Sequence, residues 1–542
     1  MSVTGIKLST YVEQLKRNGF TYAGKFGQGW LKFTGDLNAR GTAYACEFLV
    51  PRTLDEIPLV AVKSLPRGLP TLLPHLTASG YLCYIAAGSI ALDLFDPIGQ
   101  TLACLQRAGE VLARVLADEM VEDLVDEFHH FWGKYDCLLD IQGNLLGAHP
   151  AYFTEDTDTF VFVISDDKAR TERKLQALGH RLKPEPIVTI RVRTSVRPFP
   201  LQKDWPPKDV GSLLRWQSIL DPCCRRRLEE KLVQRYKSGY QHATVIIDSP
   251  VLHYGFFVKF TRPVYRGGRR RSAQQEIYGL HITELRCIRI DDRYIAERSL
   301  PSAAKTLSSL DVVLVGCGTI GGFLAEMLVK AGAGSLGGRL TLVDSDRLGP
   351  QNLGRHRLGM PHMFKNKAVQ MAAELERLAP GARIDAKPVD VKTIQLGNPD
   401  LLIDATGAQS LTDWLMWQYA KSSPVLAAWV EGPGLAVRAL MKHLPEHACS
   451  RCISQPPHSG AYQVFTEPTP TVLKGHGCEG LFVPFPATAS IQAASLAMEM
   501  LQAWLEDRLE HTLQTRVLDN SRTLKTGDCT PTRQEGCLAC HS

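Results

Sequence analysis

The chain has 542 residues, of which 44% are hydrophobic and 22% are charged, and its formal net charge is +6. This length allows about two to four domains, and the ordinary composition favours globular domains over a disordered chain. No stretch approaches the roughly 18 apolar residues of a membrane span, and residues 1–20 lack the apolar core of a signal peptide. We therefore expect a cytoplasmic protein with no membrane partner.

Two arginine runs concentrate positive charge in the central third of the chain. They are Arg225–Arg227 and Arg269–Arg271, and neither is interleaved with aromatic residues. Interfaces with single-stranded nucleic acid combine such cations with aromatic side chains. The sequence therefore favours solvated arginine-rich loops, and we expect no nucleic-acid partner.

The N-terminal part of the chain has the pattern of a small α+β domain. Helical spacing of apolar residues predicts an initial helix over residues 9–17 and a long helix from about 98 to 132. Between them, short apolar runs predict strands at 30–33, 43–49 and 59–62.

An extended segment before the long helix carries Cys83. Pro74-His75-Leu76 is followed by Gly80-Tyr81-Leu82-Cys83, and this resembles the approach to the catalytic cysteine in ubiquitin-conjugating enzymes. The His-Pro-Asn pattern of eukaryotic members is absent, and bacterial conjugating-type domains are more similar to this form. The resemblance implies a ubiquitin-conjugating-like domain over residues 1–135, with Cys83 as a thioester-forming nucleophile. A buried structural cysteine is the alternative.

The central residues 136–300 show many strand signals and no catalytic constellation. A helix is expected over about 213–236 and a strand over 277–282. The adjacent Cys223 and Cys224 cannot form a metal site alone, so packing or a solvent-facing thiol is favoured. We expect a β-rich linker domain that orients the two ends of the chain, and a degenerate adenylation-like half is the alternative.

A pattern of strand, glycine turn, helix and strand runs from Val312 to Asp344. Its turn contains the three glycines Gly316, Gly318 and Gly321. Such glycines let the backbone approach a phosphate at a helix N-terminus, where unpaired N–H groups favour anions. Asp344 ends the second strand, where a carboxylate can accept hydrogen bonds from ribose hydroxyls. Dehydrogenases, methyltransferases and ATP-using adenylating enzymes share this pattern, so it does not distinguish them.

The polar residues that follow do distinguish these classes. They occur in the order D-x-D, N-x-x-R, K and D-x-T, starting from Asp344-Ser-Asp346 and continuing with Asn352, Arg355, Lys367 and Asp404. This order resembles the ThiF/MoeB/HesA branch of the ubiquitin-activating-enzyme superfamily and implies an α/β, Rossmann-like adenylation domain over residues 301–542. By the resemblance, Asp344 holds the ribose of ATP, Asn352, Arg355 and Lys367 contact the phosphates, and Asp404 holds Mg²⁺. Fixed cations and Mg²⁺ suit adenylation because charge develops on the departing pyrophosphate.

Two assignments in this domain have competitors. Lys365 competes with Lys367 for the phosphates, and Lys367 is preferred because it heads a predicted helix. In the resembled family, an arginine shortly before the glycine turn reaches the ATP of the partner subunit. Arg298 is a candidate for that role, and an ordinary surface arginine is favoured.

Two C-x-x-C pairs predict a metal site in the same domain. They are Cys449 with Cys452 and Cys537 with Cys540, whereas the remaining cysteines follow no disulfide framework. Four thiolates give Zn²⁺ a closed tetrahedral site, which is structural because no coordination position stays open. Disulfides are the alternative, and paired two-residue gaps in a reducing compartment favour zinc. His541 is not expected to be a ligand.

Cys478 lies between the two pairs in a glycine-flanked segment, GHGCEG. The segment resembles the ThiF/MoeB region in which a cysteine precedes a strand, a proline-containing loop and a helix, here expected over 491–504. The resemblance implies that Cys478 takes the carrier's carbonyl group from AMP as a thioester. Residues 454–477, rich in proline and glycine, predict a crossover loop over the active site, and a structural cysteine is the alternative reading of Cys478.

A conjugating-like domain ahead of an activating-like domain resembles the Cap2 family of bacterial CBASS anti-phage operons. In that family the C-terminal glycine of a nucleotidyltransferase (CD-NTase) is adenylated, passed to two cysteines and joined to an amine of an acceptor protein, which primes the CD-NTase. The resemblance implies the same activity here and a homodimer. One alternative is a MoeB/ThiF-like activator of a sulfur carrier or other ubiquitin-like protein, in which Cys83 is dispensable. Another is a nucleotide-sensing protein without chemistry, against which the intact Arg355, Lys367 and Asp404 argue.

Overall fold

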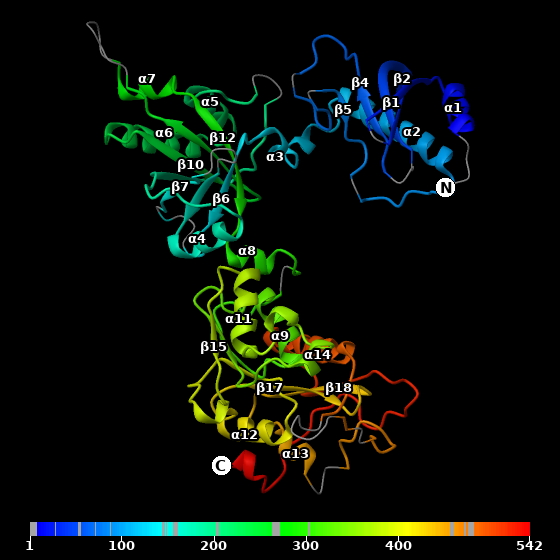
Figure 1. Ribbon diagram of the computed structural model, residues 1–542. Helices are drawn as coiled ribbons and strands as arrows, with labels where there is room; N and C mark the ends of the chain where they lie inside the picture. The colour runs from blue at the N-terminus through cyan, green and yellow to red at the C-terminus, as the bar shows by residue number, and fades with distance from the viewer. Residues whose placement is uncertain are drawn as a thin grey trace. The chain divides into compact units, whose positions relative to one another are not determined.

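The computed structural model forms two compact units (Figure 1). It describes residues 8–27, 29–52, 56–70, 72–77, 79–86, 88–143, 147, 149–155, 161–201, 205–262, 271–301, 304–455, 460–470, 473–474 and 482–541. The first unit comprises residues 1–137, 146–151 and 185–288, and the second comprises 138–145, 152–184 and 289–542. The residues predicted as a central domain are therefore divided between the two units. Within the described ranges, no helix is both long and apolar enough to cross a bilayer.

The N-terminal part of the first unit is an antiparallel sheet with two helices packed on it. The strand order is β1 (Thr21–Phe26), β2 (Trp30–Ala39), β3 (Thr42–Pro51), β4 (Leu59–Val62) and β5 (Tyr81–Leu82). Helix α1 (Leu8–Arg17) packs on β1 and α2 (Pro97–Leu116) packs on β2. Their apolar faces enclose one core with the sheet, and the strands and initial helix predicted here are confirmed.

The predicted long helix ends sixteen residues early, at Leu116 instead of Trp132. Asp118 has a left-handed backbone with φ of 57°, which stops the helix. A 3₁₀ turn, η1 (Val121–Leu124), and the short α3 (Phe128–Phe131) follow. Phe128 and Trp132 pack in a different core from α2, so the single-helix prediction was wrong.

That second core belongs to a mixed α/β layer in the first unit. Its strands lie in the order β12 (Ile282–Arg289), β11 (His253–Lys259), β10 (His242–Asp248) and β9 (Thr189–Arg193). Helices α5 (Val210–Leu220), α6 (Pro222–Lys237) and α7 (Ala273–Tyr278) supply apolar residues to the same core. Phe128 and Trp132 stack with Trp216 there.

Two sequence predictions in this layer were wrong. The helix expected over 213–236 is interrupted at Asp221, which caps α6 by accepting hydrogen bonds from the amides of Cys223 and Cys224. The strand expected over 277–282 overlaps α7, because Ser272 and Gln275 form a capping box that starts a helix there. Two of the boundaries between the two units fall within strands, after Cys137 in β6 (Tyr135–Asp140) and after Ala151 in β7 (Ala151–Phe153).

The second unit contains the predicted Rossmann-like sheet. The strand order is β15 (Ile384–Lys387), β14 (Arg339–Val343), β13 (Asp311–Val315), β16 (Leu401–Asp404), β17 (Val425–Glu431), β18 (Ala436–Lys442) and β19 (Leu513–Val517). The first five strands are parallel, β18 runs antiparallel to both of its neighbours, and β19 therefore has the direction of the first five. β14 and β16 flank β13, so the order reverses there, and ligands bind at such switch points in open α/β sheets.

Helices cover both faces of this sheet. One face carries α9 (Thr319–Lys330), α11 (Lys367–Leu378) and α14 (Ala487–Leu505). The other carries α12 (Gln409–Tyr419) and the short α13 (Ser450–Ser454). The remaining elements are β8 (Phe162–Ser165), α4 (Lys168–Ala177), α8 (Asp292–Glu297), α10 (Pro350–Leu353), η2 (Met360–His362), η3 (Val391–Thr393) and α15 (Leu538–His541). The predicted α/β class and the helix expected over 491–504 are confirmed.

Candidate functional site

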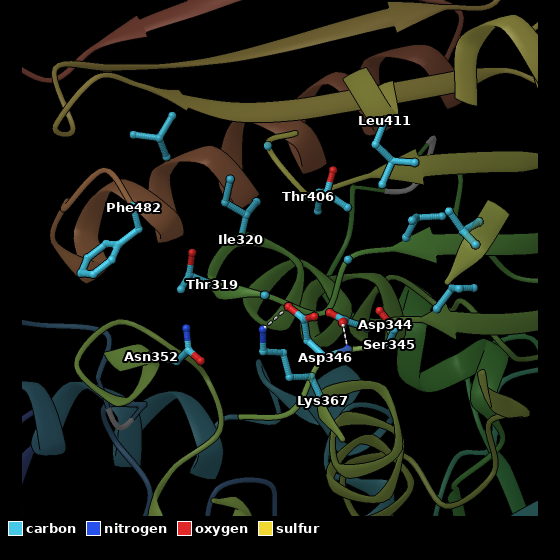
Figure 2. A pocket seen from close by; sticks show the side chains of 18 of the residues that line it. Thr319, Ile320, Asp344, Ser345, Asp346, Asn352, Lys367, Thr406, Leu411 and Phe482 are labelled. Atoms are coloured by element: carbon cyan, nitrogen blue, oxygen red, sulfur yellow. Dashed lines mark hydrogen bonds and ion pairs between the residues drawn. The ribbon is translucent and has the colours of Figure 1, made fainter. Parts of the chain in front are cut away.

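A cavity of about 620 Å³ opens at the carboxyl ends of β13, β14 and β16 (Figure 2). Six of the eight residues assigned to nucleotide binding on sequence grounds line it: Gly316, Gly318, Asp344, Asn352, Arg355 and Lys367. Thr406 of the D-x-T element also lines the cavity, whereas Gly321 and Asp404 do not. Lys365 does not line the cavity. The structure thus brings together most residues that the sequence placed on a nucleotide.

The glycine turn is built for close backbone approach. Gly316 has φ of +88°, and a Cβ atom on Gly321 would lie 1.8 Å from the carbonyl oxygen of Gly316. A Cβ on Gly318 would meet no atom within 4 Å, so the missing side chain leaves room in the cavity. Gly318 caps α9, whose first amide groups carry no side-chain cap. A helix N-terminus of this kind favours an anion.

Both carboxylate oxygens of Asp344 accept backbone hydrogen bonds, one from the glycine turn and one from the segment that follows β14. Oδ2 accepts from the amide of Cys317 at 2.7 Å, and Oδ1 accepts from the amide of Asp346 at 2.8 Å. Burial raises the pKa of Asp344, whereas these amide hydrogen bonds oppose the rise. Each oxygen keeps a further lone pair, so the carboxylate can still accept hydrogen bonds from a bound ligand.

Lys367 and Asp346 form an ion pair across the cavity floor. The distance from Nζ of Lys367 to Oδ2 of Asp346 is 2.9 Å, and Figure 2 shows the two side chains meeting. Lys367 is buried at the start of α11, whereas the Asp346 side chain is 67% exposed. Asp346 was not among the predicted site residues, although the D-x-D spacing after β14 was a signal for it.

Arg355 enters the cavity without an acidic partner among the described residues. Its guanidinium lies 4.2 Å from the ring centroid of Phe485 and 5.2 Å from that of Phe482. Nη1 donates to the carbonyl of Val483 at 3.2 Å. Burial lowers the pKa of Arg355, but a guanidinium stays charged at neutral pH. Asn352 accepts from the amide of Gly349 and caps α10.

Asp404 lies beneath the cavity rather than on its wall. The carboxylate is 1% exposed and accepts from the amide and hydroxyl of Thr406, at 2.9 and 2.6 Å, and from the hydroxyl of Thr412. Burial raises the pKa of Asp404. Thr406 stands between this carboxylate and the cavity, and the role predicted for Asp404 in holding Mg²⁺ stays a prediction.

The donor set of the cavity fits an adenine nucleotide with Mg²⁺. Two cationic side chains and a helix N-terminus suit phosphate groups. The carboxylates of Asp344, Asp346 and Asp390 line the cavity, and carboxylate oxygen is the ligand type that Mg²⁺ prefers.

The four predicted zinc ligands converge in the second unit. The sulfur atoms of Cys449, Cys452, Cys537 and Cys540 all lie within 4.8 Å of one another. Cys449 is 3.6 Å from Cys452 and 3.7 Å from Cys537, and Cys452 is 3.7 Å from Cys540. A tetrahedral zinc with four thiolates places sulfur atoms about 3.8 Å apart, whereas a disulfide needs about 2 Å. The cluster can therefore hold a zinc ion and contains no disulfide.

We predict that this cluster stabilises the adenylation domain through zinc. Cys452→Ser should lower zinc content from one ion per chain to none and lower the melting temperature by roughly 10 °C, because the site joins segments distant in sequence. Elemental analysis and thermal unfolding measure both. Cys529→Ser is the control, since Cys529 packs beside the cluster outside the ligand set. The prediction would be contradicted if wild-type protein purified without zinc were as stable as the zinc-containing protein.

Cys83 is exposed and directly follows the edge strand β5. Its amide donates to the carbonyl of His75 at 2.7 Å. A largely apolar groove of about 790 Å³ runs beside it, with Trp30, Tyr81 and Ile90 among its lining residues. Burial, followed by the nearby carboxylate of Glu127, raises the pKa of the Cys83 thiol. Cys83 is thus not buried, and its role as a thioester-forming nucleophile stays a prediction.

An acid–histidine network beside Cys83 was missed by sequence reasoning. His75 has a left-handed backbone with φ of 59°, a conformation that costs about 1–2 kcal/mol. Its ring contacts Asp123 at 2.9 Å and Glu127 at 2.7 Å, and its amide donates to Glu127 at 3.0 Å. These contacts, with Glu127 the largest contributor, raise the pKa of His75 to about 9. The acidic run before Phe128 was the only sequence signal.

This network predicts a pH-dependent stability of the first unit. The His75 pKa is raised from 6.5 to about 9, so its stabilisation is complete below pH 6.5 and is lost as pH rises through 9. It contributes about 1–3 kcal/mol at most. The melting temperature of wild type minus that of His75→Gln should therefore shrink from pH 6 to pH 9.5. His281→Gln, at an exposed histidine, should show no such trend, and a pH-independent difference for His75→Gln would disprove the assignment.

Cys478 and Arg298 were also candidate site residues. Cys478 lies outside the described residues, as does part of the predicted crossover loop. Arg298 follows α8 and stacks over Tyr294 at 5.7 Å from the ring centroid. The expectation of an ordinary surface arginine, with contact to a partner subunit's nucleotide as the other candidate role, stays a prediction.

Two family models match parts of the chain. The ThiF family model matches residues 292–539, and the Prokaryotic E2 family B model matches residues 30–138. The solved structure of Escherichia coli MccB with ATP is 15% identical, covering 43% of this chain and 67% of that chain with a TM-score of 0.32. A similarity that low supports no argument about the site.

Two relatives span nearly the whole chain. The ATP-dependent ubiquitin transferase-like protein Cap2 of Pseudomonas aeruginosa (strain BWHPSA011 / Pa011) is 44% identical over 534 residues, which is 98% of each chain. The Cap2 protein of Escherichia coli (strain TW11681) is 23% identical over 581 aligned positions, covering 98% of this chain and 97% of that one. Both the activating-type and the conjugating-type family models match, and a Cap2 protein is 44% identical over 98% of each chain. The chain therefore belongs to the Cap2 family of ATP-dependent ubiquitin transferase-like enzymes.

Proposed function

We propose that this protein activates the C-terminal glycine of a carrier protein with ATP and transfers it through two cysteines to a target amine. The observation that carries the proposal is the presence, in one chain, of a cation-lined cavity at the Rossmann switch point and an exposed cysteine on a conjugating-type sheet. A simple nucleotide sensor needs no exposed nucleophile, whereas acyl transfer needs one.

Adenylation comes first. An oxygen of the carrier's terminal carboxylate attacks the α-phosphorus of ATP, the acyl–AMP anhydride forms, and pyrophosphate leaves. Asp344 holds the ribose, and the amides at the start of α9 face the phosphates. Arg355, Lys367 and Asn352 bind the pyrophosphate as its charge grows. Asp346 or the predicted Asp404 would hold Mg²⁺, which would supply further charge neutralisation when bound.

Two thioesters follow the adenylate. The Cys478 thiolate attacks the acyl carbon and AMP leaves, and then the Cys83 thiolate attacks the same carbon and releases Cys478. An amine of the acceptor protein finally displaces Cys83 and forms an amide. Exchange between thioesters is nearly isoenergetic, so the energy of ATP is retained until the amide forms. Four cysteine ligands would leave no coordination position open on a bound zinc, so this site would stabilise the fold and take no part in the reaction.

The carrier that we propose is the CD-NTase of a CBASS operon, which conjugation would prime for signal synthesis in anti-phage defence. The name of the relatives supports ubiquitin-like transfer. A homodimer is proposed as the assembly, with Arg298 a candidate for reaching the partner's nucleotide.

Carrier-dependent ATP–pyrophosphate exchange tests this function. The protein is mixed with ATP, Mg²⁺, labelled pyrophosphate and a CD-NTase ending in glycine, or the same CD-NTase lacking that glycine. Exchange is expected only with the glycine-ended carrier, because the reverse reaction needs the acyl–AMP anhydride. Exchange with a sulfur-carrier protein instead would favour the MoeB/ThiF-like alternative. Absence of exchange with either carrier would contradict adenylation.

A further inference from the structure

Arg355 differs from the other cation in the nucleotide cavity. Lys367 is neutralised by Asp346 at 2.9 Å, whereas Arg355 forms no ion pair with any acidic residue in the described part of the chain. Its neighbours are the rings of Phe482 and Phe485 and the carbonyl of Val483. Its Nε atom is buried and has no hydrogen-bond partner among the described atoms.

Aromatic rings restrain a guanidinium without cancelling its charge. The negative face of each ring attracts the cation through its quadrupole, and no carboxylate among the described residues is paired with Arg355 in competition with an arriving phosphate. A charge held in a partly desolvated site interacts more strongly with an anion than the same charge in water. Arg355 is thus restrained and uncompensated, which is the arrangement that stabilises charge developing in a transition state.

The two rings are themselves held by the fold. Phe485 precedes Pro486, the N-cap residue of α14. Phe485 packs closely on the β17–β18 turn, because a Cβ atom built on Gly434 would lie 3.3 Å from the Cβ of Phe485. Phe482 is fixed by two backbone hydrogen bonds of 2.9 Å with Lys474. The aromatic clamp, Phe482 with Phe485, is therefore held by an isolated β-bridge at one residue and by the start of α14 at the other.

We propose that this aromatic clamp is a positioning device for Arg355 in the adenylation step, with Phe485 as its main residue. The proposal rests on the proposed function and adds residues for which no role was predicted. Phe485 acts through Arg355 and does not touch the reacting atoms. Its removal should lower kcat more than it changes KM for ATP, because Lys367 and the start of α9 still bind the ground state.

A double-mutant cycle with carrier-dependent ATP–pyrophosphate exchange as the readout tests this proposal. Phe485→Leu should lower kcat about tenfold, whereas Phe485→Tyr, which keeps the ring face, should stay within about twofold of wild type. In an Arg355→Met background, Phe485→Leu should cost less than about twofold, because the residue through which it acts is gone. Phe364→Leu is the matched control, since Phe364 is 64% exposed and does not line the cavity.

The outcomes separate the two proposals. An equal tenfold loss in both backgrounds would mean that Phe485 is only structural, and wild-type activity in Phe485→Leu would remove its role altogether. If Phe485→Leu fails to unfold cooperatively, Phe482→Leu takes its place, with the same loss of effect expected in the Arg355→Met background. Absence of carrier-dependent exchange in the wild type would instead contradict the proposed function itself.

Discussion

Replacing Lys367 by alanine is expected to lower carrier-dependent ATP–pyrophosphate exchange by a factor of about 10² to 10³. The substitution removes a buried cation from the cavity and leaves Asp346 unpaired beside the phosphates. Both changes oppose the growth of negative charge on the departing pyrophosphate. Exchange rates at saturating carrier measure the loss.

The neighbouring Lys365 supplies a matched control for this substitution. It lies two residues away in sequence and does not line the cavity, so Lys365→Ala should keep exchange within about twofold of wild type. Equal losses at the two positions would show that Lys367 does not contact the phosphates. Thermal unfolding of each variant separates chemistry from a loss of folded protein.

Replacing Cys83 by alanine is expected to lower the yield of amide-linked product by at least about a thousandfold, because no other group replaces a deleted nucleophile. Exchange should stay at the wild-type level, since adenylation takes place in the other cavity. Product bands that survive reductant on a denaturing gel measure the loss.

Cys223 provides the control, because it is also exposed and lies in the same unit. Cys223→Ala should form product as the wild type does. Full product formation by Cys83→Ala would remove the conjugating role from the N-terminal sheet and favour a MoeB/ThiF-like activator.

Local patterns explain what could be predicted from the sequence. The strand over 312–315, the glycine turn and the start of α11 depend on neighbouring residues, and all are present in the structure. The two C-x-x-C pairs were also predictable, because each is a local turn with the same metal-binding spacing. Family resemblance supplied the roles of these residues.

Contacts between distant segments could not be predicted in this way. Arg355 and Val483 are 128 positions apart, and His75 and Glu127 are 52 apart; neither pair leaves a periodic signal. The early end of α2 has the same origin, because Phe128 and Trp132 join a core built from residues far along the chain. Asp404 was recognised by its place in a motif, and only the fold reveals that Thr406 and Thr412 enclose its carboxylate.

An acid-quenched single turnover tests whether the acyl group passes through the two cysteines in series. The protein, a glycine-ended CD-NTase, ATP and Mg²⁺ are mixed, quenched at successive times, digested and analysed by mass spectrometry for thioester-linked peptides. If the two cysteines act in series, the carrier's C-terminal peptide is found first on Cys478 and then on Cys83. The thioester on Cys478 should decay as the thioester on Cys83 rises. A thioester on Cys83 that forms equally fast in Cys478→Ala, or an amide product with no thioester on either cysteine, would contradict transfer in series.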